Sequence, residues 1–267
     1  MIESKEIKGI IEKRKSIRKY KSQILSEEIL NNINKKIDEV IPLYSDISYS
    51  IEIIKNEKPK NKKAPYYLIF CGENNDKSYE NIGFIGQQLN LYFAMIGIGA
   101  CWQMGKPKAF KNKFKDNYNS NTNNNTNNSN NNTNNSNNNT NNNNDLDYIV
   151  SMAFGEADEK LYRELDEFNR KPLSKISEGK DNRLNSVRLS PSGINAQSWY
   201  FIAKNNEIHC YRRKLNFLTK FLLNKLNAID IGIAICHIYY ESENFNFLQI
   251  SNPQKKEGFI YVGTVTN

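Results

Sequence analysis

The chain has 267 residues, of which 38% are hydrophobic and 25% are charged, and its formal net charge is +8. This length fits one large domain or two small ones, and the sequence has no uninterrupted apolar run of about 18 residues that could span a membrane. The N-terminal segment is charged rather than apolar, unlike a signal peptide, so we expect a soluble, cytoplasmic protein.

The positive charge indicates little about partners. Lys, Asn and Ile are abundant together, which a genome of low GC content produces without selection for a polyanionic partner. An RNA-binding protein would also need motifs that combine aromatic and basic residues, and the sequence has none. We therefore expect no nucleic-acid partner and no membrane partner.

Two helices are predicted first. The isoleucines of residues 7–11 have helical spacing behind Ser4, a candidate N-cap. Ser26 is a suitable N-cap for a second helix, whose apolar stripe ends at Val40. Both helices therefore have one apolar face to bury.

A buried strand and a central helix follow. Residues 66–71 form a short apolar run between Pro65 and Gly72, which is typical of a buried strand. Residues 82–98 are apolar on most faces and have a helical period, so we expect a central or interface helix that ends near Gly97.

Residues 117–144 consist almost entirely of Asn, Ser and Thr. Without this tract the hydrophobic share of the chain rises to roughly 42%, an ordinary globular composition. The tract cannot bury enough apolar surface to offset its ordering entropy, so we predict a disordered surface insertion. Structure resumes with a strand predicted at residues 148–155.

The second part of the chain repeats this order of elements. An aromatic strand at 199–202 is similar to that at 66–70, and Asp-Ile-Gly-Ile at 230–233 begins an apolar helix as Asn-Ile-Gly-Phe does at 81–84. A strand that reaches Gly263 matches the one that ends at Gly155. The helix motifs lie 149 positions apart and these strands 108, so the second copy is abbreviated.

We interpret the chain as two degenerate copies of one α+β unit, fused as a pseudo-dimer over residues 1–175 and 176–267. Chance similarity between short apolar runs is the alternative interpretation.

Several common sites are absent from the sequence. The four cysteines lie far apart without a CxxC motif, which predicts reduced thiols and no metal site. His237 lies in the second apolar helix, where a packed histidine is more common than a catalytic one, and no Ser/His/Asp set is evident. Residues 97–102 and 105–107 match neither the dinucleotide fingerprint nor the phosphate loop.

Two other motifs suggest binding chemistry. Arg14, Lys15, Ser16 and Arg18 surround a predicted helix end with cations and a hydroxyl, which suits a phosphate, although this motif by itself favours a solvated basic turn. The turn at 190–199 (Ser-Pro-Ser-Gly-Ile-Asn-Ala-Gln-Ser-Trp) presents hydroxyl and amide groups before a buried Trp, which suits a flat polar heterocycle; a purely structural turn is the alternative.

These motifs, with Asn-Ile-Gly and Gly-Ile-Gly-Ala-Cys-Trp-Gln-Met-Gly in 81–105, Gly155, and Asn-Arg-Lys-Pro-Leu at 169–173, together resemble the FMN-dependent nitroreductase family. In that family two identical subunits share two flavin sites. Here the first half has the basic motif without the Ser-Pro-Ser turn, and the second half has the turn without the basic motif. The chain therefore resembles two-copy members of the family, whose mixed β-sheets are flanked by helices, and the resemblance implies one FMN per chain and a monomer.

The resemblance also implies residue roles. The FMN phosphate and ribityl chain would contact Arg14, Lys15, Ser16 and Arg170, and Arg18 would face the pyrimidine side of the ring, where the reduced flavin is negative. The remaining implied contacts are backbone groups near flavin N5 and a turn against the ring: Gln103, Met104, Gly105, Ser190, Pro191, Ser192 and Asn195, with Gln197 either on the ring or holding the turn.

The implied activity is ping-pong hydride transfer from NADH or NADPH through flavin N5 to a nitroaromatic, quinone or similar small-molecule acceptor, with no protein nucleophile. Ser198 replaces a proline common in the family, so a flavin-storage or flavin-sensing protein without turnover is the alternative.

Overall fold

The computed structural model describes residues 2–57, 59, 63–110, 146–215 and 217–266. The predicted disordered insertion at 117–144 lies outside the described residues.

The described helices and strands confirm the α+β class. The first sheet contains strands β1 (Tyr49–Lys55), β2 (Tyr66–Gly72), β3 (Gly99–Gln103) and β4 (Asp147–Gly155). Their order is β1-β2-β4-β3, and all neighbours are antiparallel.

The second sheet repeats this arrangement and adds one strand. It contains β5 (Ser177–Glu178), β6 (Trp199–Lys204), β7 (Glu207–Arg213), β8 (Asn246–Leu248) and β9 (Phe259–Thr266), in the order β5-β6-β7-β9-β8. Apart from the parallel β5–β6 pair, its neighbours are antiparallel. The order β6-β7-β9-β8 therefore matches β1-β2-β4-β3.

Helices surround and connect these sheets. They are α1 (Ile2–Ile11), α2 (Glu27–Glu39), α3 (Asp76–Met95), α5 (Leu173–Ile176), α6 (Arg183–Leu189) and α7 (Phe217–Glu241), with 3-10 turns η1 (Leu165–Glu167) and η2 (Gly193–Asn195). Ser26 is the N-cap of α2, as predicted, because its side chain accepts a hydrogen bond from the Ile29 backbone. The cap assigned to Ser4 is wrong, because α1 begins at Ile2. None of these helices has the length and hydropathy that a membrane crossing requires.

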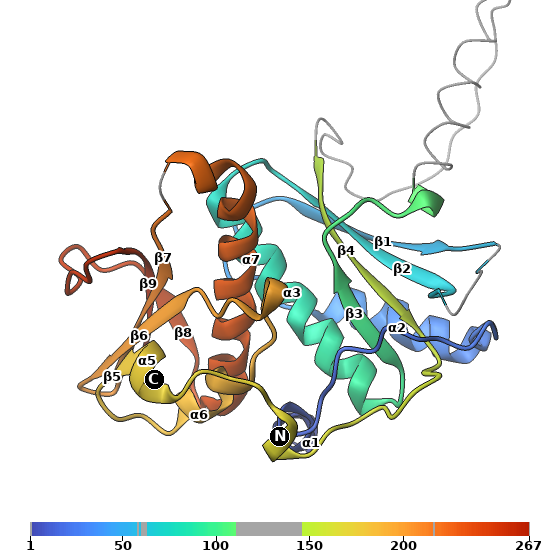
Figure 1. The fold of residues 1–267 in the computed structure, drawn as a ribbon, viewed down its shortest axis with the longest axis horizontal. Helices are drawn as coiled ribbons and strands as arrows, with labels where there is room; N and C mark the ends of the chain where they lie inside the picture. The colour runs from blue at the N-terminus through green and yellow to red at the C-terminus, as the bar shows by residue number, and fades with distance from the viewer. Residues whose placement is uncertain (1, 58, 60–62, 111–145, 216, 267) are drawn as a thin grey trace, which may run out of the picture.

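The long helices α3 and α7 lie side by side between the two sheets (Figure 1). They cross at two glycines. A Cβ added at Gly83 would lie 2.1 Å from the Ile229 carbonyl oxygen, and one at Gly232 would lie 1.9 Å from the Glu80 carbonyl oxygen. Gly83 faces residue 229, which is three positions before Gly232, and Gly232 faces residue 80, which is three positions before Gly83. A two-fold axis produces such a reciprocal pair of contacts. The predicted pseudo-dimer is confirmed.

The two halves share their cores. Ile7, Ile10 and Ile11 of α1 pack in the cluster that holds the second sheet, together with Trp199 and Phe201. Conversely, Ile229 and Ile233 of α7 pack in the cluster under the first sheet. Each half therefore completes the hydrophobic core of the other, and neither buries its own apolar surface alone.

One strand equivalence in the repeat was wrong. We matched residues 199–202 to the strand at 66–70, but the strand that precedes the long helix in each half is β2 or β7. The aromatic strand β6 therefore corresponds to β1. Strand β1 is followed by β2, which pairs with β4, and β6 is followed by β7, which pairs with β9.

Candidate functional site

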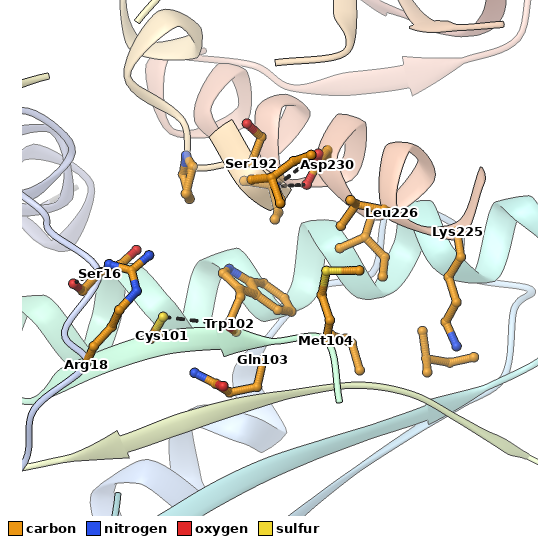
Figure 2. A pocket seen from close by; sticks show the side chains of 17 residues that line it. Ser16, Arg18, Cys101, Trp102, Gln103, Met104, Ser192, Lys225, Leu226 and Asp230 are labelled. Atoms are coloured by element: carbon orange, nitrogen blue, oxygen red, sulfur yellow. Dashed lines mark hydrogen bonds between the residues drawn. The ribbon is translucent and has the colours of Figure 1, made fainter. Parts of the chain in front are cut away.

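A cavity of about 240 Å³ lies between the two halves. Figure 2 shows Ser16 and Arg18 at one end and Lys225 at the other, with Trp102 and Met104 between them. Its lining comes from both halves: Ser16, Arg18, Cys101, Trp102, Gln103, Met104, Ile149 and Val150 from the first, and Pro191, Ser192, Gly193, Ile194, Lys225, Leu226, Ile229, Asp230 and Ile233 from the second.

Half of the predicted binding residues line this cavity. They are the backbone segment and turn residues together with two members of the basic motif: Ser16, Arg18, Gln103, Met104, Pro191 and Ser192. The structure thus places the basic motif of the first half opposite the Ser-Pro-Ser turn of the second half.

The other predicted residues lie behind or beside the cavity. Lys15 donates to Glu159 at 2.9 Å and to the Lys160 carbonyl at 3.1 Å, so its ammonium already has protein partners. The Gly105 carbonyl accepts from Tyr148. Ser190 is fully buried at the end of α6, and its hydroxyl has no hydrogen-bond partner. Asn195 accepts a hydrogen bond from Arg170 at 2.8 Å.

A cluster of arginines lies behind Ser16. Arg14 is 2% exposed, its Nη1 is 3.5 Å from the Ser16 hydroxyl, and its Nη2 has no hydrogen-bond partner. Burial and the charges of Arg163 and Arg170 lower the pKa of Arg14 to about 9. Burial and Arg163 likewise lower the pKa of Arg170 to about 10. This arginine cluster (Arg14, Arg163, Arg170) therefore favours a bound anion.

The anion that fits is one with several acceptor oxygens. Burial lowers the pKa of Arg163, and the exposed Glu167 opposes this shift only in part. No carboxylate among the described residues forms an ion pair with Arg14, Arg163 or Arg170. Arg163 Nε and Arg170 Nε are also buried without partners. A phosphate would supply acceptors to these forked donors and would offset their mutual repulsion.

The turn at 190–197 is held in an uncommon backbone conformation. Ile194, Asn195 and Gln197 have φ values of 47°, 58° and 47°, in the left-handed region. The Ser192 hydroxyl accepts from the Gln197 backbone, and Gln197 Oε1 accepts from the Lys171 backbone at 2.8 Å. Gln197 therefore holds the turn, which was one of its two predicted roles.

Trp102 forms the aromatic wall of the cavity. Its ring stacks on Phe70 at 5.6 Å between centroids, and it fits against Gly86, where an added Cβ would lie 2.3 Å from the ring. Its indole nitrogen lies 3.5 Å from Gln87 Oε1. The position of this wall is thus fixed by residues of α3 and β2.

A buried chain of hydrogen bonds extends from the contact between Trp102 and Gln87 into α7. His237 Nδ1 lies 2.8 Å from the Ser186 carbonyl, which only accepts, so Nδ1 carries the proton. His237 Nε2 then accepts from Gln87 Nε2 at 3.0 Å. His237 is fully buried, and burial lowers its pKa to about 3. It is a packed histidine, as predicted.

Several lining residues were not predicted from the sequence. Trp102 and Cys101 lie in the motif that carried the family resemblance, but their side chains received no role. Asp230 and Lys225 lie on the inward face of an apolar helix, where Asp230 stands out in the sequence as an acidic residue. Arg163 could not be recognised from the sequence, because only tertiary contacts bring it to Arg14. Its backbone N–H donates a hydrogen bond to the Lys13 carbonyl.

The pseudo-symmetric counterpart of this cavity is filled by the protein itself. Tyr44 packs its ring on Phe247 at 5.8 Å, and its hydroxyl donates to Glu80 at 2.8 Å. Glu80 also pairs with Arg212, which in turn pairs with Asp76. The α3 residues that match the cavity-lining residues of α7 are therefore partnered within the protein.

These features define an α+β pseudo-dimer with a cavity between its halves and an arginine cluster behind that cavity. A family model described as "Putative TM nitroreductase" matches residues 6–126 and 124–242, in two tandem copies. The chain belongs to this nitroreductase family.

A solved structure supports the fold. This chain is similar to a putative nitroreductase from Thermotoga maritima, with a TM-score of 0.60 and 17% identity over 97% of this chain and 91% of that chain. It also matches a nitroreductase with bound FMN from Desulfitobacterium hafniense (TM-score 0.42, 13% identity, 62% of this chain and 98% of that chain). A third match is the FMN-dependent nitroreductase NfnB from Mycobacterium smegmatis in complex with NADPH (TM-score 0.45, 11% identity, 67% and 99%). No curated protein matches.

Proposed function

We propose that this protein is an FMN-dependent oxidoreductase that transfers hydride from NADH or NADPH to a nitroaromatic, quinone or similar acceptor, in ping-pong order. Membership in the nitroreductase family supports the class of reaction. The observation that supports FMN as the cofactor is the arginine cluster. Arg14 is buried with an unpartnered Nη2 and two neighbouring guanidinium groups, directly behind a cavity lined by Ser16.

The residues of the site fit FMN. The arginine cluster and Ser16 suit its phosphate, and the apolar walls of Trp102, Leu226 and Ile233 suit its ring. Arg18 lines the same cavity and offers a cation to the side of the ring that becomes negative on reduction. Bound FMN would supply the two-electron chemistry, and the protein would bind, orient and shield it.

The mouth of the cavity fits a flat apolar acceptor. Met104 is 60% exposed and Ile194 is 81% exposed, although both are large hydrophobic residues. One comes from each half of the chain, and both line the cavity. Exposed apolar side chains at the rim of a pocket are typical of a surface that contacts a ligand.

We also propose a cytoplasmic monomer. NADH and NADPH are cytoplasmic donors, and the four free cysteines, of which three are buried, suit a reducing compartment. The interface that a homodimeric relative would form between subunits is internal here, between α3 and α7.

Flavin content and reduction test this proposal directly. The purified protein should be yellow or take up added FMN, and anaerobic NADH or NADPH should bleach the flavin absorbance. A quinone should then restore it. Protein that neither contains nor binds FMN contradicts the proposal. Protein that binds FMN but shows no quinone-dependent NAD(P)H oxidation supports the storage or sensing alternative instead.

Ser16→Asp tests the phosphate assignment. The new carboxylate would stand beside the arginine cluster, neutralise it and repel a phosphate. We expect the variant to fold and to lose FMN retention. Unchanged flavin content would refute this use of the cluster.

A further inference from the structure

Asp230 is a buried carboxyl group on the wall of the cavity. It is 2% exposed, and its two oxygens accept hydrogen bonds from the Gly193 backbone at 2.9 and 3.2 Å (Figure 2). In the part of the chain that the structure describes, no lysine or arginine forms an ion pair with it. Buried acids of this kind are rare without a compensating charge.

The other half of the molecule shows what the turn requires at this position. Asn81 is the residue of α3 that matches Asp230, and its Oδ1 accepts from the backbones of Leu43 and Tyr44 at 2.7 and 3.2 Å. An amide therefore holds the equivalent loop in the same way. The carboxyl at 230 adds one property that the amide lacks, which is a proton that it can donate as an acid.

The surroundings of Asp230 favour its neutral form. Burial raises its pKa to about 8, and the Gly193 N–H opposes this only in part. The charged or titratable groups that share its cavity are Lys225 from the same helix and Arg18 and Cys101 from the first half. Glu80, across the α3–α7 crossing, is itself buried, and burial raises its pKa to about 7.

We propose that Asp230 is the acid of this cavity and donates the proton that the acceptor requires when it receives hydride. This inference rests on the proposed function. A quinone that receives hydride gains an electron pair in a new bond to hydrogen and becomes an anion. The O–H bond of Asp230 then breaks, its electron pair stays on the carboxylate, and the proton neutralises the anion; solvent afterwards restores the acid.

The first test measures the proton itself, without cofactor. In protein labelled with ¹³C-aspartate, infrared spectroscopy should show the carbonyl stretch of a protonated aspartic acid at pH 7, which disappears above about pH 8. Asp230→Asn should lack this band. The labelled wild type suffices if the variant does not fold. A wild-type protein with no protonated aspartate at pH 7 overturns the inference.

The second test separates the two half-reactions. Protein carrying FMN is reduced with NADPH and then mixed with a quinone. The wild-type rate of reoxidation should fall above about pH 8, and Asp230→Asn should reoxidise at least about 100-fold more slowly at pH 7 without that pH dependence. Glu80→Gln is the matched control, because it replaces a buried acid on α3 that does not line the cavity. This variant should keep the wild-type pH profile of reoxidation.

The outcomes are distinguishable. Equal reoxidation of Asp230→Asn and wild type overturns the inference and leaves the proposed function intact. Protein that shows the infrared band but binds no FMN contradicts the proposed function, and the catalytic role of Asp230 fails with it. Slow reoxidation of Asp230→Asn, with the flavin bound and reducible, supports both.

Discussion

Arg14 shows how a single residue can be unfavourable for folding and still useful. Its guanidinium is buried next to Arg163 and Arg170, and one of its nitrogens has no partner. Burying an uncompensated cation costs several kcal/mol, even after relaxation. Such a cost is typical of a binding site in which the compensating charge arrives with the ligand.

Arg14→Met should therefore stabilise the FMN-free protein and weaken FMN binding. Loss of a buried, repelled cation is expected to raise the free energy of unfolding by about 1–3 kcal/mol. Loss of one charged hydrogen bond to the phosphate should raise the Kd for FMN about 10-fold to 100-fold. Urea denaturation and fluorescence titration measure the two effects.

Lys21→Met is the control for Arg14→Met. Lys21 forms an exposed ion pair with Glu156, away from the arginine cluster. Its replacement should change stability by less than about 1 kcal/mol and leave the Kd for FMN unchanged. If Arg14→Met is destabilised, or binds FMN as the wild type does, the proposed phosphate site is wrong.

At the scale of elements, the crossing of α3 and α7 depends on Gly83 and Gly232. Either residue changed to Ala would push its Cβ into a carbonyl oxygen of the facing helix. We expect each variant to lose about 2–3 kcal/mol of stability, although Ala is the better helix former by about 1 kcal/mol. Gly9→Ala in α1 has free space and should instead gain up to about 1 kcal/mol. Thermal denaturation of the three variants compares them; equal effects would contradict this account of the crossing.

His237 links α7 to α6 and α3 and should make the protein sensitive to acid. Burial lowers its pKa to about 3, so the folded protein keeps the ring neutral while the unfolded chain takes up a proton below about pH 6.5. Its contribution to stability is thus present above about pH 6.5 and is lost as the pH falls toward 3.

His237→Gln should flatten this dependence. Gln88 holds the matching position on α3 and donates to the Ile41 carbonyl at 2.8 Å, which shows that an amide suits this kind of contact. The free energy of unfolding of wild type and variant, measured by urea denaturation from pH 4 to 7, should converge as the pH falls. A constant difference would exclude His237 as the source.

The elements that the sequence predicts well are those with uniform burial. Helix α3 is buried over most of its length, and strands β2 and β4 consist largely of buried apolar residues, so these elements can be recognised from their residue pattern. Strand β1 was missed, because it alternates exposed and partly buried residues within a charged segment. The short strand β8 pairs over three residues and has no pattern long enough to recognise.

The candidate site divides in the same way. The motif residues Ser16, Arg18 and Ser192 could be found from residue type and spacing, and the structure brings them to one cavity. Lys15 has the right type, but Glu159, distant in sequence, binds its ammonium. Contacts of this kind depend on tertiary packing, which no local pattern contains.

At the scale of the whole molecule, the backbones of the two halves have a two-fold arrangement, but the side chains at the two junctions between the halves differ. One junction contains a cavity with an arginine cluster behind it. At the other, Tyr44, Phe247, Glu80 and Arg212 fill the space and bind one another. Bulky side chains and buried ion pairs cannot rearrange for a ring system without leaving charges unpaired.

We therefore expect about one FMN per chain at saturation, since sites of this size are few in a protein. Denaturation releases the flavin, whose absorbance is compared with the protein concentration, while light scattering measures the mass in solution. Arg14→Met sharpens the count. In a chain with one site, titration of the variant with FMN should give a single binding curve with the raised Kd, because the filled junction leaves no room for a second flavin. A variant that still binds part of the flavin with the wild-type Kd, or a wild type with two per chain, would show that the second junction also binds.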